Sequence, residues 1–357
     1  MSSTKGSTKR RMFALRAVVY HEVGKYTIER DKPVPVPAEG QVLIKVKACG
    51  VCATDVHLHH GNFLAAYPFT PGHELAGAIE AVGPGVTDFR VGDRVCTDPV
   101  ETCGTCYYCK RNQPLYCERF VSYGCNRDGG FAEYVVADQS RVFSIHDLTW
   151  DQAVLVEPTA CAVHGLEVIQ IRPGDKVLMF GTGPSGIILA QLLKHAGAGE
   201  LVVVGSSQRK LDVVEKLTDA TTVAMDRDDY SKHTERLKRI APRGFDVVVD
   251  VTGAPKVIEH AVSFAARGGK LVIYGVAPND SRIQLNPYDI FINELKVLGS
   301  FAEYRRFDQA IEFIRKGVVK GGFITHRYRI DQWGEALEQV ERGRDRIKVV
   351  VEPERTE

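Results

Sequence analysis

The segment that most constrains the fold is KVLMFGTGPSGIILAQLL, which spans residues 176–193. Its glycines Gly181, Gly183 and Gly186 have the spacing G-x-G-x-x-G and stand between an apolar strand pattern and an apolar helix pattern. The first glycine permits a tight turn, the second lets a pyrophosphate approach the backbone, and the third lets helix and strand pack closely. Free N–H groups at the helix N-terminus would bind the phosphates. The segment therefore predicts a dinucleotide-binding turn.

The sequence around this turn continues the same alternation of strand and helix. Apolar strand-like runs are predicted over 201–205, 221–226, 245–253, 270–275 and 296–301. Helix-length segments lie between them, at 184–197, 208–217, 228–241 and 254–269. Apolar strands separated by helices with polar faces are typical of a parallel sheet that helices cover on both sides. The chain is therefore predicted to contain a doubly wound α/β domain.

The rest of the chain has a different pattern. From Leu15 to about Trp150 it consists of short β-type runs broken by glycine and proline, which is typical of a compact, mainly β domain. A length of 357 residues is enough for two domains with separate cores. We expect the mainly β domain over 14–160 and 300–357 and the doubly wound domain over 161–299, after a disordered tail at 1–13.

The composition limits the partners of the protein. Its 46 Lys and Arg residues balance 45 Asp and Glu residues, so no general field attracts nucleic acid or an acidic membrane surface. No segment approaches the roughly 18 consecutive apolar residues that span a membrane. The nine cysteines, an odd number, fit poorly with a secreted disulfide framework and favour reduced thiols. We expect a soluble, cytoplasmic protein that binds neither nucleic acid nor membranes.

The end of the second predicted strand should discriminate between the two nicotinamide dinucleotides. An acid there hydrogen-bonds the adenosine ribose of NAD and repels the 2′-phosphate of NADP. That place falls at Gly205, 19 positions after Gly186. It is followed by Ser206 and Arg209, which supply a hydroxyl group and a positive charge. Although Arg209 could simply belong to the solvated first turn of a helix, we predict that NADP binds at Gly205, Ser206 and Arg209, with NAD as the second choice.

Four cysteines lie close together in the segment CGTCYYCKRNQPLYC, with the spacing C-x2-C-x2-C-x7-C. They are Cys103, Cys106, Cys109 and Cys117. Four thiolates on short loops suit a closed tetrahedral zinc site, which would hold together a lobe too short to have its own core. An iron–sulfur cluster is the alternative, but the common ferredoxin run has its fourth cysteine after three intervening residues and before a proline. We therefore predict one structural zinc ion.

A second set of candidate metal ligands is dispersed along the chain. GVCATDVH contains Cys52, Thr54, Asp55 and His57, PGHELAG contains His73 and Glu74, and VEPTACAVHG contains Glu157. Each of these residues alone would more often be structural. Together with the four cysteines and the glycine turn, they resemble the motifs of the zinc-containing medium-chain alcohol and polyol dehydrogenase family, over about residues 15–352. The resemblance implies a GroES-like catalytic domain, a Rossmann domain and a cleft between them.

The resemblance also implies a metal-binding role for four of these residues. Cys52 and His73 match the family's catalytic zinc ligands. Glu74 and Glu157 match two carboxylates that can exchange as further ligands, and Glu157 stands where simple alcohol dehydrogenases tend to have a second cysteine. Carboxylate in place of thiolate leaves zinc more electrophilic. This ligand set favours the sorbitol dehydrogenase-like branch of the family.

Residues near these ligands are expected to move protons and to orient the site. Thr54 and His57 match the family's proton relay, for which a histidine is suited because its pKa lies near neutral pH. Asp55 is expected to orient His73, since zinc-bound imidazoles usually donate their other N–H to such a group. The remaining cysteines are predicted to be small buried apolar residues, namely Cys49, Cys96, Cys125 and Cys161.

These roles imply an enzyme that interconverts a polyol, such as D-arabinitol, sorbitol or xylitol, and its ketose with NADP(H) and a catalytic zinc ion. The family also implies a homodimer or homotetramer. Two departures limit the assignment, since sorbitol dehydrogenases have a tyrosine at Leu58 and an arginine–tyrosine pair at Ala302 and Glu303. A secondary-alcohol or aldehyde reductase is the first alternative. A nucleotide-binding protein without turnover is the second, which the intact ligand set disfavours.

Overall fold

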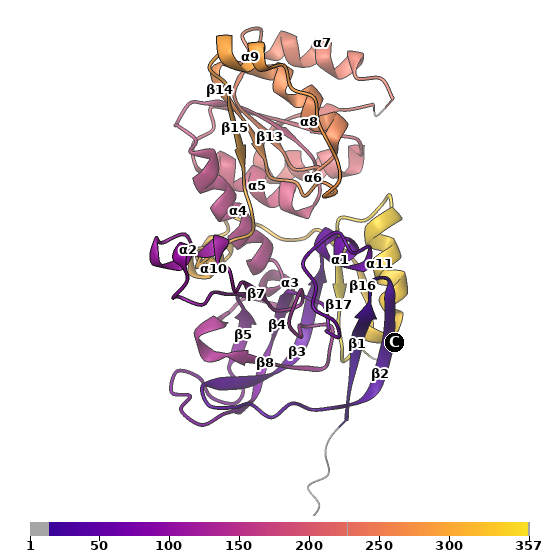
Figure 1. Ribbon diagram of the computed structural model, residues 1–357. Helices are drawn as coiled ribbons and strands as arrows, with labels where there is room; N and C mark the ends of the chain where they lie inside the picture. The colour runs from indigo at the N-terminus through magenta and orange to yellow at the C-terminus, as the bar shows by residue number, and fades with distance from the viewer. Residues whose placement is uncertain (1–13, 227, 356–357) are drawn as a thin grey trace, which may run out of the picture.

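The computed structural model describes residues 14–226 and 228–355, and these form two lobes (Figure 1). The upper lobe is a parallel sheet with helices, and the lower lobe is mainly β. The α/β fold class predicted from the sequence is therefore confirmed. The tail predicted at 1–13 lies outside the described residues. Within the described ranges, no helix combines the length and the apolar character that crossing a membrane requires.

The upper lobe contains a six-stranded sheet with the order β12-β11-β10-β13-β14-β15, in which every neighbouring pair is parallel. Its strands are β10 (Lys176–Phe180), β11 (Glu200–Gly205), β12 (Thr221–Ala224), β13 (Phe245–Asp250), β14 (Ala265–Ile273) and β15 (Lys296–Gly299). Its helices are α5 (Pro184–His195), α6 (Gln208–Thr218), α7 (Ser231–Ile240), α8 (Pro255–Ala261) and α9 (Pro287–Ile292). This strand order is that of a doubly wound dinucleotide-binding domain.

One helix of this lobe is shorter than its sequence pattern predicts. The prediction covers 254–269, but α8 ends at Ala261, and one 3-10 turn leads directly into β14. Ala265 already pairs with Phe245 of β13. Sheet pairing therefore overrides the helix propensity of the alanines in this segment.

The lower lobe is built on a sheet with the order β16-β17-β3-β4-β5-β9, and β8 pairs with β3. Its strands are β3 (Gln41–Val51), β4 (Glu74–Val82), β5 (Arg94–Thr97), β8 (Tyr134–Asp138), β9 (Val142–Ser144), β16 (Ile324–Tyr328) and β17 (Lys348–Val351). Two separate strand pairs are β1 (Ala14–Glu22) with β2 (Lys25–Pro33), and β6 (Val100–Glu101) with β7 (Val121–Ser122). The short helices are α1 (Ala53–His59), α2 (Tyr107–Lys110) and α3 (Trp150–Ala153), and α11 (Trp333–Arg342) is longer.

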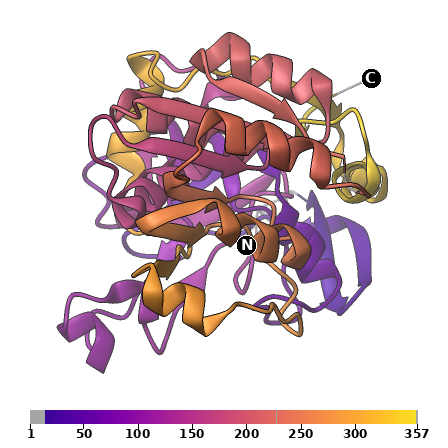
Figure 2. The same ribbon diagram turned by 90° about the horizontal axis from the view of Figure 1, so that it is seen from above.

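Both ends of the chain contribute to the lower lobe. The C-terminal strand β17 is antiparallel to β3, so that Val349 lies opposite Val51. Figures 1 and 2 show the yellow α11 beside the indigo N-terminal strands, and they show α2 projecting from the side of the molecule. The chain thus leaves the lower lobe, builds the upper one and returns.

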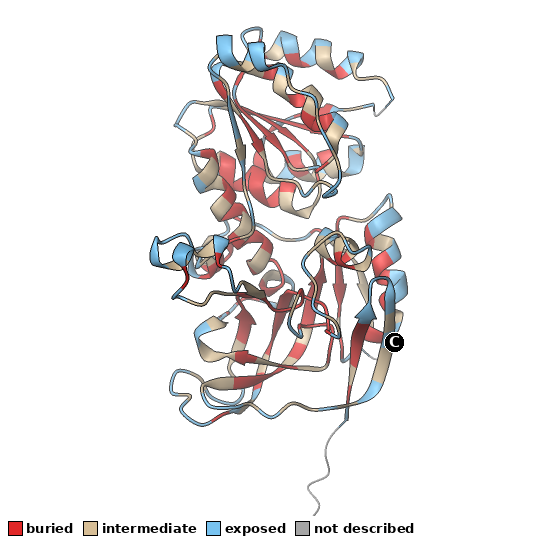
Figure 3. Cartoon of the chain, in the orientation of Figure 1, coloured by how far each residue is buried: buried red, intermediate tan, exposed pale blue. Residues whose placement is uncertain are grey.

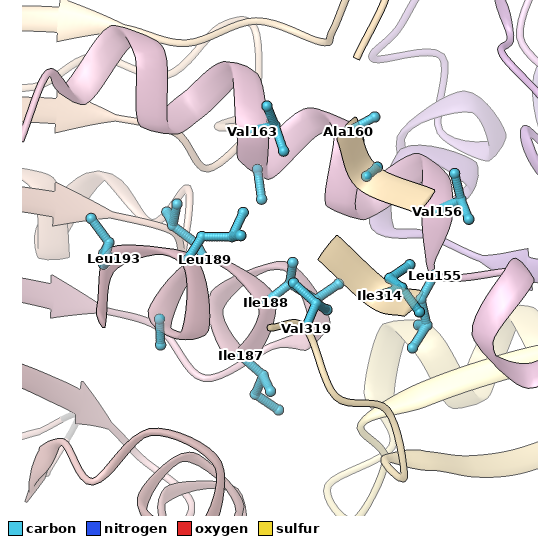
Figure 4. Close-up of a cluster of buried hydrophobic side chains, with 14 of the residues drawn as sticks. Leu155, Val156, Ala160, Val163, Ile187, Ile188, Leu189, Leu193, Ile314 and Val319 are labelled. Carbon is cyan, nitrogen blue, oxygen red and sulfur yellow. The ribbon is translucent and has the colours of Figure 1, made fainter. Parts of the chain in front are cut away.

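Helix α4 (Val156–Ile169) joins the two lobes, and the domain boundary predicted after residue 160 lies within it. This helix packs against α5 and α10 (Phe307–Arg315) through buried aliphatic side chains that include Val163, Ile188 and Ile314 (Figure 4). Figure 3 shows the buried residues that continue from this junction into both sheets. Burying each such side chain contributes roughly 1.5–3 kcal/mol. The packing fixes the first turn of α4 in place between the lobes.

Candidate active site

Cys52, His73 and Glu74 form the first candidate metal centre. One ligand atom of each residue lies within 4.8 Å of the other two. Cys52 is the N-cap of α1, Glu74 is the first residue of β4, and His73 directly precedes that strand. Both His73 and Glu74 are buried, whereas Cys52 is partly exposed. A thiolate, an imidazole and a carboxylate so close together suit a zinc ion that keeps a fourth position open.

Glu74 forms a buried ion pair with Lys348 of β17, and the side chains of Lys348 and Glu74 are 2% and 1% exposed. Lys348 Nζ also donates to the carbonyl of Val51 at 3.2 Å. A Cβ at Gly50 would lie 1.9 Å from Glu74 Oε2, so only glycine leaves room for the pair. Because a buried carboxylate is stable only when it is paired, Lys348 balances the charge of Glu74 beside the metal centre.

Asp55 lies behind His73, as the sequence predicts for a group that orients the imidazole. Its Oδ1 is 3.9 Å from His73 Nδ1, and its Oδ2 accepts the N–H of Cys52 at 2.8 Å. Asp55 Oδ1 and His73 Nδ1 are buried and have no hydrogen-bond partner among the described residues. Burial raises the pKa of Asp55 to about 6. A proton on Nδ1 that points at Asp55 would leave Nε2 for the metal.

Glu157 lies outside the cluster of three ligands that the described residues form around Cys52. It stands in the first turn of α4, where its Oε1 accepts a hydrogen bond from the Cys161 thiol at 3.3 Å. Burial raises the pKa of Glu157 to about 7. Cys161 is only partly buried and bonds to a carboxyl group, whereas the sequence predicts a buried apolar residue at this position.

Thr54 and His57 lie three residues apart on α1, so their side chains share one face of the helix. Thr54 Oγ1 is 3.6 Å from Cys52 Sγ, which places the hydroxyl at the edge of the metal centre. Burial, with a smaller contribution from His60, lowers the pKa of His57 below 6.5. A neutral imidazole at this place can accept a proton near neutral pH.

The glycine turn between β10 and α5 has the geometry that its spacing requires. Gly181 has a φ of +117°, a conformation that favours glycine. A Cβ at Gly186 would lie 2.4 Å from the carbonyl oxygen of Gly181, so the third glycine lets the helix pack onto the turn. A Cβ at Gly183 would meet nothing within 4 Å. Open space thus remains at the N-terminus of α5, where a pyrophosphate would bind.

Strand β11 ends at Gly205, and Ser206 and Arg209 follow it. A Cβ at Gly205 would lie 2.7 Å from the side chain of Thr182, so this glycine is needed for packing whichever coenzyme binds. Arg209 is exposed and donates to the carbonyl of Asp345 at 2.6 Å. This bond connects α6 to the segment before β17. An aspartate at position 205 would therefore disturb packing, whereas Arg209 can be exchanged to test coenzyme choice.

The four cysteines around α2 form the second candidate metal centre, with all sulfur atoms within 4.8 Å of one another. The Sγ–Sγ distance is 3.9 Å both for Cys103 with Cys109 and for Cys106 with Cys117. A tetrahedral zinc ion with Zn–S bonds of about 2.3 Å separates its sulfurs by about 3.8 Å. The backbone N–H of Thr105 lowers the pKa of Cys103 to about 5, which favours the thiolate. The donor set therefore fits zinc.

Three side chains near the first centre were not predicted from the sequence. Lys348 pairs with Glu74, Arg346 lies close enough to Cys52 to interact with it electrostatically, and the half-buried Tyr274 interacts in the same way with Glu157. Only Lys348 leaves a signal in the sequence, since a lysine that opens the apolar strand KVVV has no solvent to face on a central strand. The other two reach the site through tertiary packing alone.

An open metal centre, a hydroxyl–imidazole pair and a dinucleotide turn are the parts that a metal-dependent dehydrogenase needs. Two family models match this chain: "Alcohol dehydrogenase GroES-like domain" at residues 38–147 and "Zinc-binding dehydrogenase" at residues 184–316.

Individual proteins resemble the chain over almost all of its length. D-arabinitol dehydrogenase 1 from Uromyces fabae is 40% identical, over 95% of this chain and 97% of that protein. Sorbitol dehydrogenase from Bacillus subtilis (strain 168) is 34% identical, over 96% and 98%. The crystal structure of a zinc-binding dehydrogenase from Sinorhizobium meliloti 1021 bound to NADP has a TM-score of 0.87 at 30% identity, over 95% and 99%. The chain belongs to the zinc-containing medium-chain alcohol and polyol dehydrogenase family, as its motifs predict.

Proposed function

We propose that the protein oxidises a polyol to its ketose, and reduces the ketose in the reverse direction, with NADP(H) and a catalytic zinc ion. The observation that carries this proposal is the convergence of Cys52, His73 and Glu74 beside the Thr54 hydroxyl. The relatives named for D-arabinitol and sorbitol support a polyol as the substrate class.

Cys52 and His73 are proposed as permanent zinc ligands, with Glu74 and Glu157 as carboxylates that exchange. A carboxylate oxygen of Glu74 lies close to the ligand atoms of Cys52 and His73 while the side chain is paired with Lys348. Glu74 therefore has a cationic partner, zinc or Lys348, whether or not it binds the metal. Burial raises the pKa of Glu157 to about 7, because the charged form of a buried carboxyl group is costly without a cation beside it. Cys103, Cys106, Cys109 and Cys117 are proposed to hold the structural zinc ion.

The chain's own residues orient the ligands and move the proton in this scheme. When bound, zinc acidifies the substrate hydroxyl and the nicotinamide accepts the hydride. Thr54 Oγ1 accepts the substrate proton and gives up its own toward the neutral imidazole of His57, and the imidazolium that results releases a proton to solvent. Asp55 holds His73 in one orientation throughout. In the reverse direction the same two side chains deliver the proton.

NADP is proposed as the preferred coenzyme, with NAD as a weaker one. No acid stands at the end of β11, where Gly205 is followed by Ser206, and Arg209 offers a positive charge on the next helix. The Sinorhizobium meliloti structure, similar over most of the chain, is bound to NADP. A 2′-phosphate would meet a hydroxyl and a guanidinium here, whereas NAD would lack its usual carboxylate partner.

A secondary-alcohol or aldehyde reductase is the second candidate, favoured by Ala302, which stands where the resemblance to sorbitol dehydrogenases implies an arginine. Leu58 does not support it, because this residue is 1% exposed and packs in the core of the lower lobe. A panel of polyols, ketoses and short aliphatic alcohols, assayed with both coenzymes on zinc-loaded protein, separates the candidates. We expect the highest kcat/KM with a polyol. Preference for short alcohols would select the reductase, and no turnover at all would select a nucleotide-binding protein without catalysis.

We further propose a homodimer that forms through the outer edge of the upper lobe. The edge strand β15 carries Val297, and the nearby helix α9 carries Tyr288, Phe291 and Ile292, all of them exposed. Phe291 is 76% exposed, and apolar groups gathered beside an open sheet edge are typical of an interface. Light scattering after gel filtration should give a dimer mass, and Phe291→Glu should give a monomer. A monomeric wild-type protein would contradict this proposal.

A cytoplasmic location is proposed from the thiol chemistry. All nine cysteines are free in the structure, and five of them must stay reduced to bind zinc as proposed. A reducing compartment keeps them so. Cell fractionation with an antibody against the chain tests this location.

A further inference from the structure

Helix α7 has little apolar surface with which to bind the sheet of the upper lobe. Of its ten residues, all of which the structure describes, His233 and Leu237 are the buried ones. They lie four positions apart, so their side chains share one face of the helix. The helix α11, also of ten residues, instead buries Trp333, Ala336, Leu337 and Val340, the kind of apolar stripe through which helices usually pack. The attachment of α7 therefore depends on what its histidine contacts.

His233 meets a second histidine, His260 of α8. Their Nε2 atoms are 3.1 Å apart, and the two rings are nearly perpendicular, at 87°. The same nitrogen of His260 lies 3.1 Å from Thr234 Oγ1 of α7, and that hydroxyl donates to the carbonyl of Tyr230 at 2.6 Å. Three polar side chains thus form one chain of contacts between α7 and α8.

The Thr234 hydroxyl decides where the protons of the two rings lie. A hydroxyl has one hydrogen, and Thr234 gives it to the Tyr230 carbonyl, so toward His260 it can only accept. His260 Nε2 therefore carries a hydrogen, and His233 Nε2, which faces the same nitrogen, is the acceptor. The hydrogen of a neutral His233 is then on Nδ1, a buried atom that has no partner among the described residues.

A proton added to this pair has no favourable place. On His233 Nε2 it would point at the N–H of His260, and the charged ring would have two N–H groups without an acceptor among the described residues. On His260 Nδ1 it would put a charge among aromatic rings, whose centroids lie 4.8, 4.9 and 6.4 Å from that of His260 and belong to Tyr230, Phe264 and Phe180. Burying a charge without an anionic partner is costly.

The charged groups around the pair do not offset this cost. Among the described residues, Asp229 before α7 faces His233, whereas Lys238 of α7 faces His260. Burial lowers the pKa of His233 below 6.5, and burial, reinforced by His233 and Lys238, lowers the pKa of His260 to about 4. Histidines of an unfolded segment titrate near pH 6.5. The unfolded segment therefore binds more protons between about pH 4 and 6.5, so that stability is complete above this window and falls as pH drops through it.

We propose that the neutral His233–His260 pair holds α7 on the upper lobe, and that mild acid releases this helix and thereby weakens the dinucleotide turn. Segments with few buried apolar contacts open before the rest of a protein unfolds. Both histidine rings lie 6.4 Å from the ring of Phe180, which is the last residue of β10 and directly precedes Gly181. The release of α7 takes the His233 ring away from Phe180, and the turn that follows loses support.

Hydrogen exchange measured by mass spectrometry on the zinc-loaded chain tests the release without any assay of activity. The protection of α7, corrected for the intrinsic exchange rate, should fall by about 30-fold or more between about pH 7.5 and pH 5. That factor is what one histidine contributes when its pKa is about 4 in the folded state and about 6.5 in the open state. Helix α11, whose sequence contains no histidine, is the internal control and should change little. Equal falls in α7 and α11, or no fall in α7, would overturn the proposal.

Two variants assign the effect to the pair. His260→Gln removes the titration and keeps the donor, because the amide nitrogen can replace Nε2 toward Thr234 and His233, so its α7 protection should fall about 30-fold less than that of the wild type. His233→Gln, whose amide oxygen can accept from His260, should also reduce the fall and serves if H260Q does not fold. His195→Gln, exposed on α5 of the same lobe, is the matched control and should behave as the wild type. A fall as large as that of the wild type in H260Q and H233Q would overturn the proposal.

The link between α7 and the dinucleotide turn rests on the proposed coenzyme and has its own readout. NADP at about 100 times its dissociation constant should raise the protection of α7 at about pH 5 by up to about 100-fold, because a ligand that binds only the closed form suppresses opening by this factor. Unchanged protection in NADP-saturated protein would overturn the link to the turn. A wild-type protein that binds no NADP at neutral pH would contradict the proposed coenzyme instead, and exchange in the unliganded chain would still test the histidine pair.

Discussion

The two candidate metal centres are built from similar ligands in opposite ways. The cysteine lobe takes all four sulfurs from residues 103–117, where short loops bring them together. The centre at Cys52 takes its candidate ligands from the N-cap of α1 and from the point where β4 begins. It also depends on Lys348, which lies 274 positions beyond Glu74 in the sequence. One centre is thus a local structure, and the other exists only after the sheet of the lower lobe has formed.

This difference distinguishes a site suited to stabilising the fold from a site suited to catalysis. Four identical thiolates close a tetrahedron and leave no position for a substrate. The mixed set of Cys52, His73 and Glu74 would leave one position of a bound zinc ion open, and the carboxylate of Glu74 is also paired with Lys348. The comparison predicts that changes at the metal ligands of the first centre alter activity, that loss of Lys348 alters stability, and that changes at the lobe alter stability more than activity.

Cys52→Ser should have the largest effect. The metal ion that acidifies the substrate hydroxyl is then bound less firmly. We therefore expect kcat/KM to fall by more than about 10³-fold, with little change in the melting temperature. Cys96→Ala, which alters a buried cysteine without a predicted role, is the control and should keep its activity. A C52S enzyme with activity close to that of the wild type would show that Cys52 is not a ligand of the catalytic metal.

Lys348→Met should cost about 3–5 kcal/mol in the free energy of unfolding, since Glu74 is left charged and unpaired in the interior. Urea unfolding measures this loss. Lys316→Met removes an exposed partner of Glu312 and should change stability by less than about 1 kcal/mol. Similar losses for the two variants would mean that the ion pair does not stabilise the first centre.

His57→Gln should slow polyol oxidation by about 10²-fold, because the proton loses its acceptor. The pKa of His57 lies below 6.5, so the wild-type rate should fall only when pH drops through that lowered value and protonates the imidazole. The variant should lose this inflection in the pH profile of kcat/KM. His21→Gln, an exposed histidine of β1, should retain it, and an inflection that persists in H57Q would assign it to another group.

Cys106→Ser should lower activity by less than about tenfold, since the lobe touches no reacting atom, while zinc content falls from two ions per chain to one. The melting temperature should drop at the same time. Atomic absorption and thermal unfolding measure the two effects. A variant that keeps both zinc ions would contradict the four-cysteine site.

Arg209→Ala should have the most selective effect, a loss of about tenfold in kcat/KM with NADP and almost none with NAD, without a change in stability. This residue lies far from both metal centres in the sequence. Its substitution should therefore change only the preference in kcat/KM between NADP and NAD. Lys210→Ala, the next residue on α6, is the matched control. If the ratio of kcat/KM with NADP to kcat/KM with NAD is unchanged in R209A, the 2′-phosphate binds elsewhere.

Features with local causes could be predicted from the sequence. The glycine turn is fixed by the contact between Gly186 and Gly181, five residues apart, and the doubly wound lobe follows from its alternating apolar runs. The helix predicted over 254–269 was too long because Ala265 pairs with Phe245 of another strand. Helix propensity depends on local sequence and does not reflect such a contact between strands.

The sequence by itself determined the α/β fold, the four-cysteine cluster and the motifs that identify the family, because each of these depends on residues close together in the chain. Only the tertiary structure decided that Glu74 pairs with Lys348 and that Glu303 is buried. It also placed Glu157 outside the cluster around Cys52. Buried charges are stable only beside suitable partners, and in this chain those partners come from strands and loops that are distant in sequence and meet only on folding.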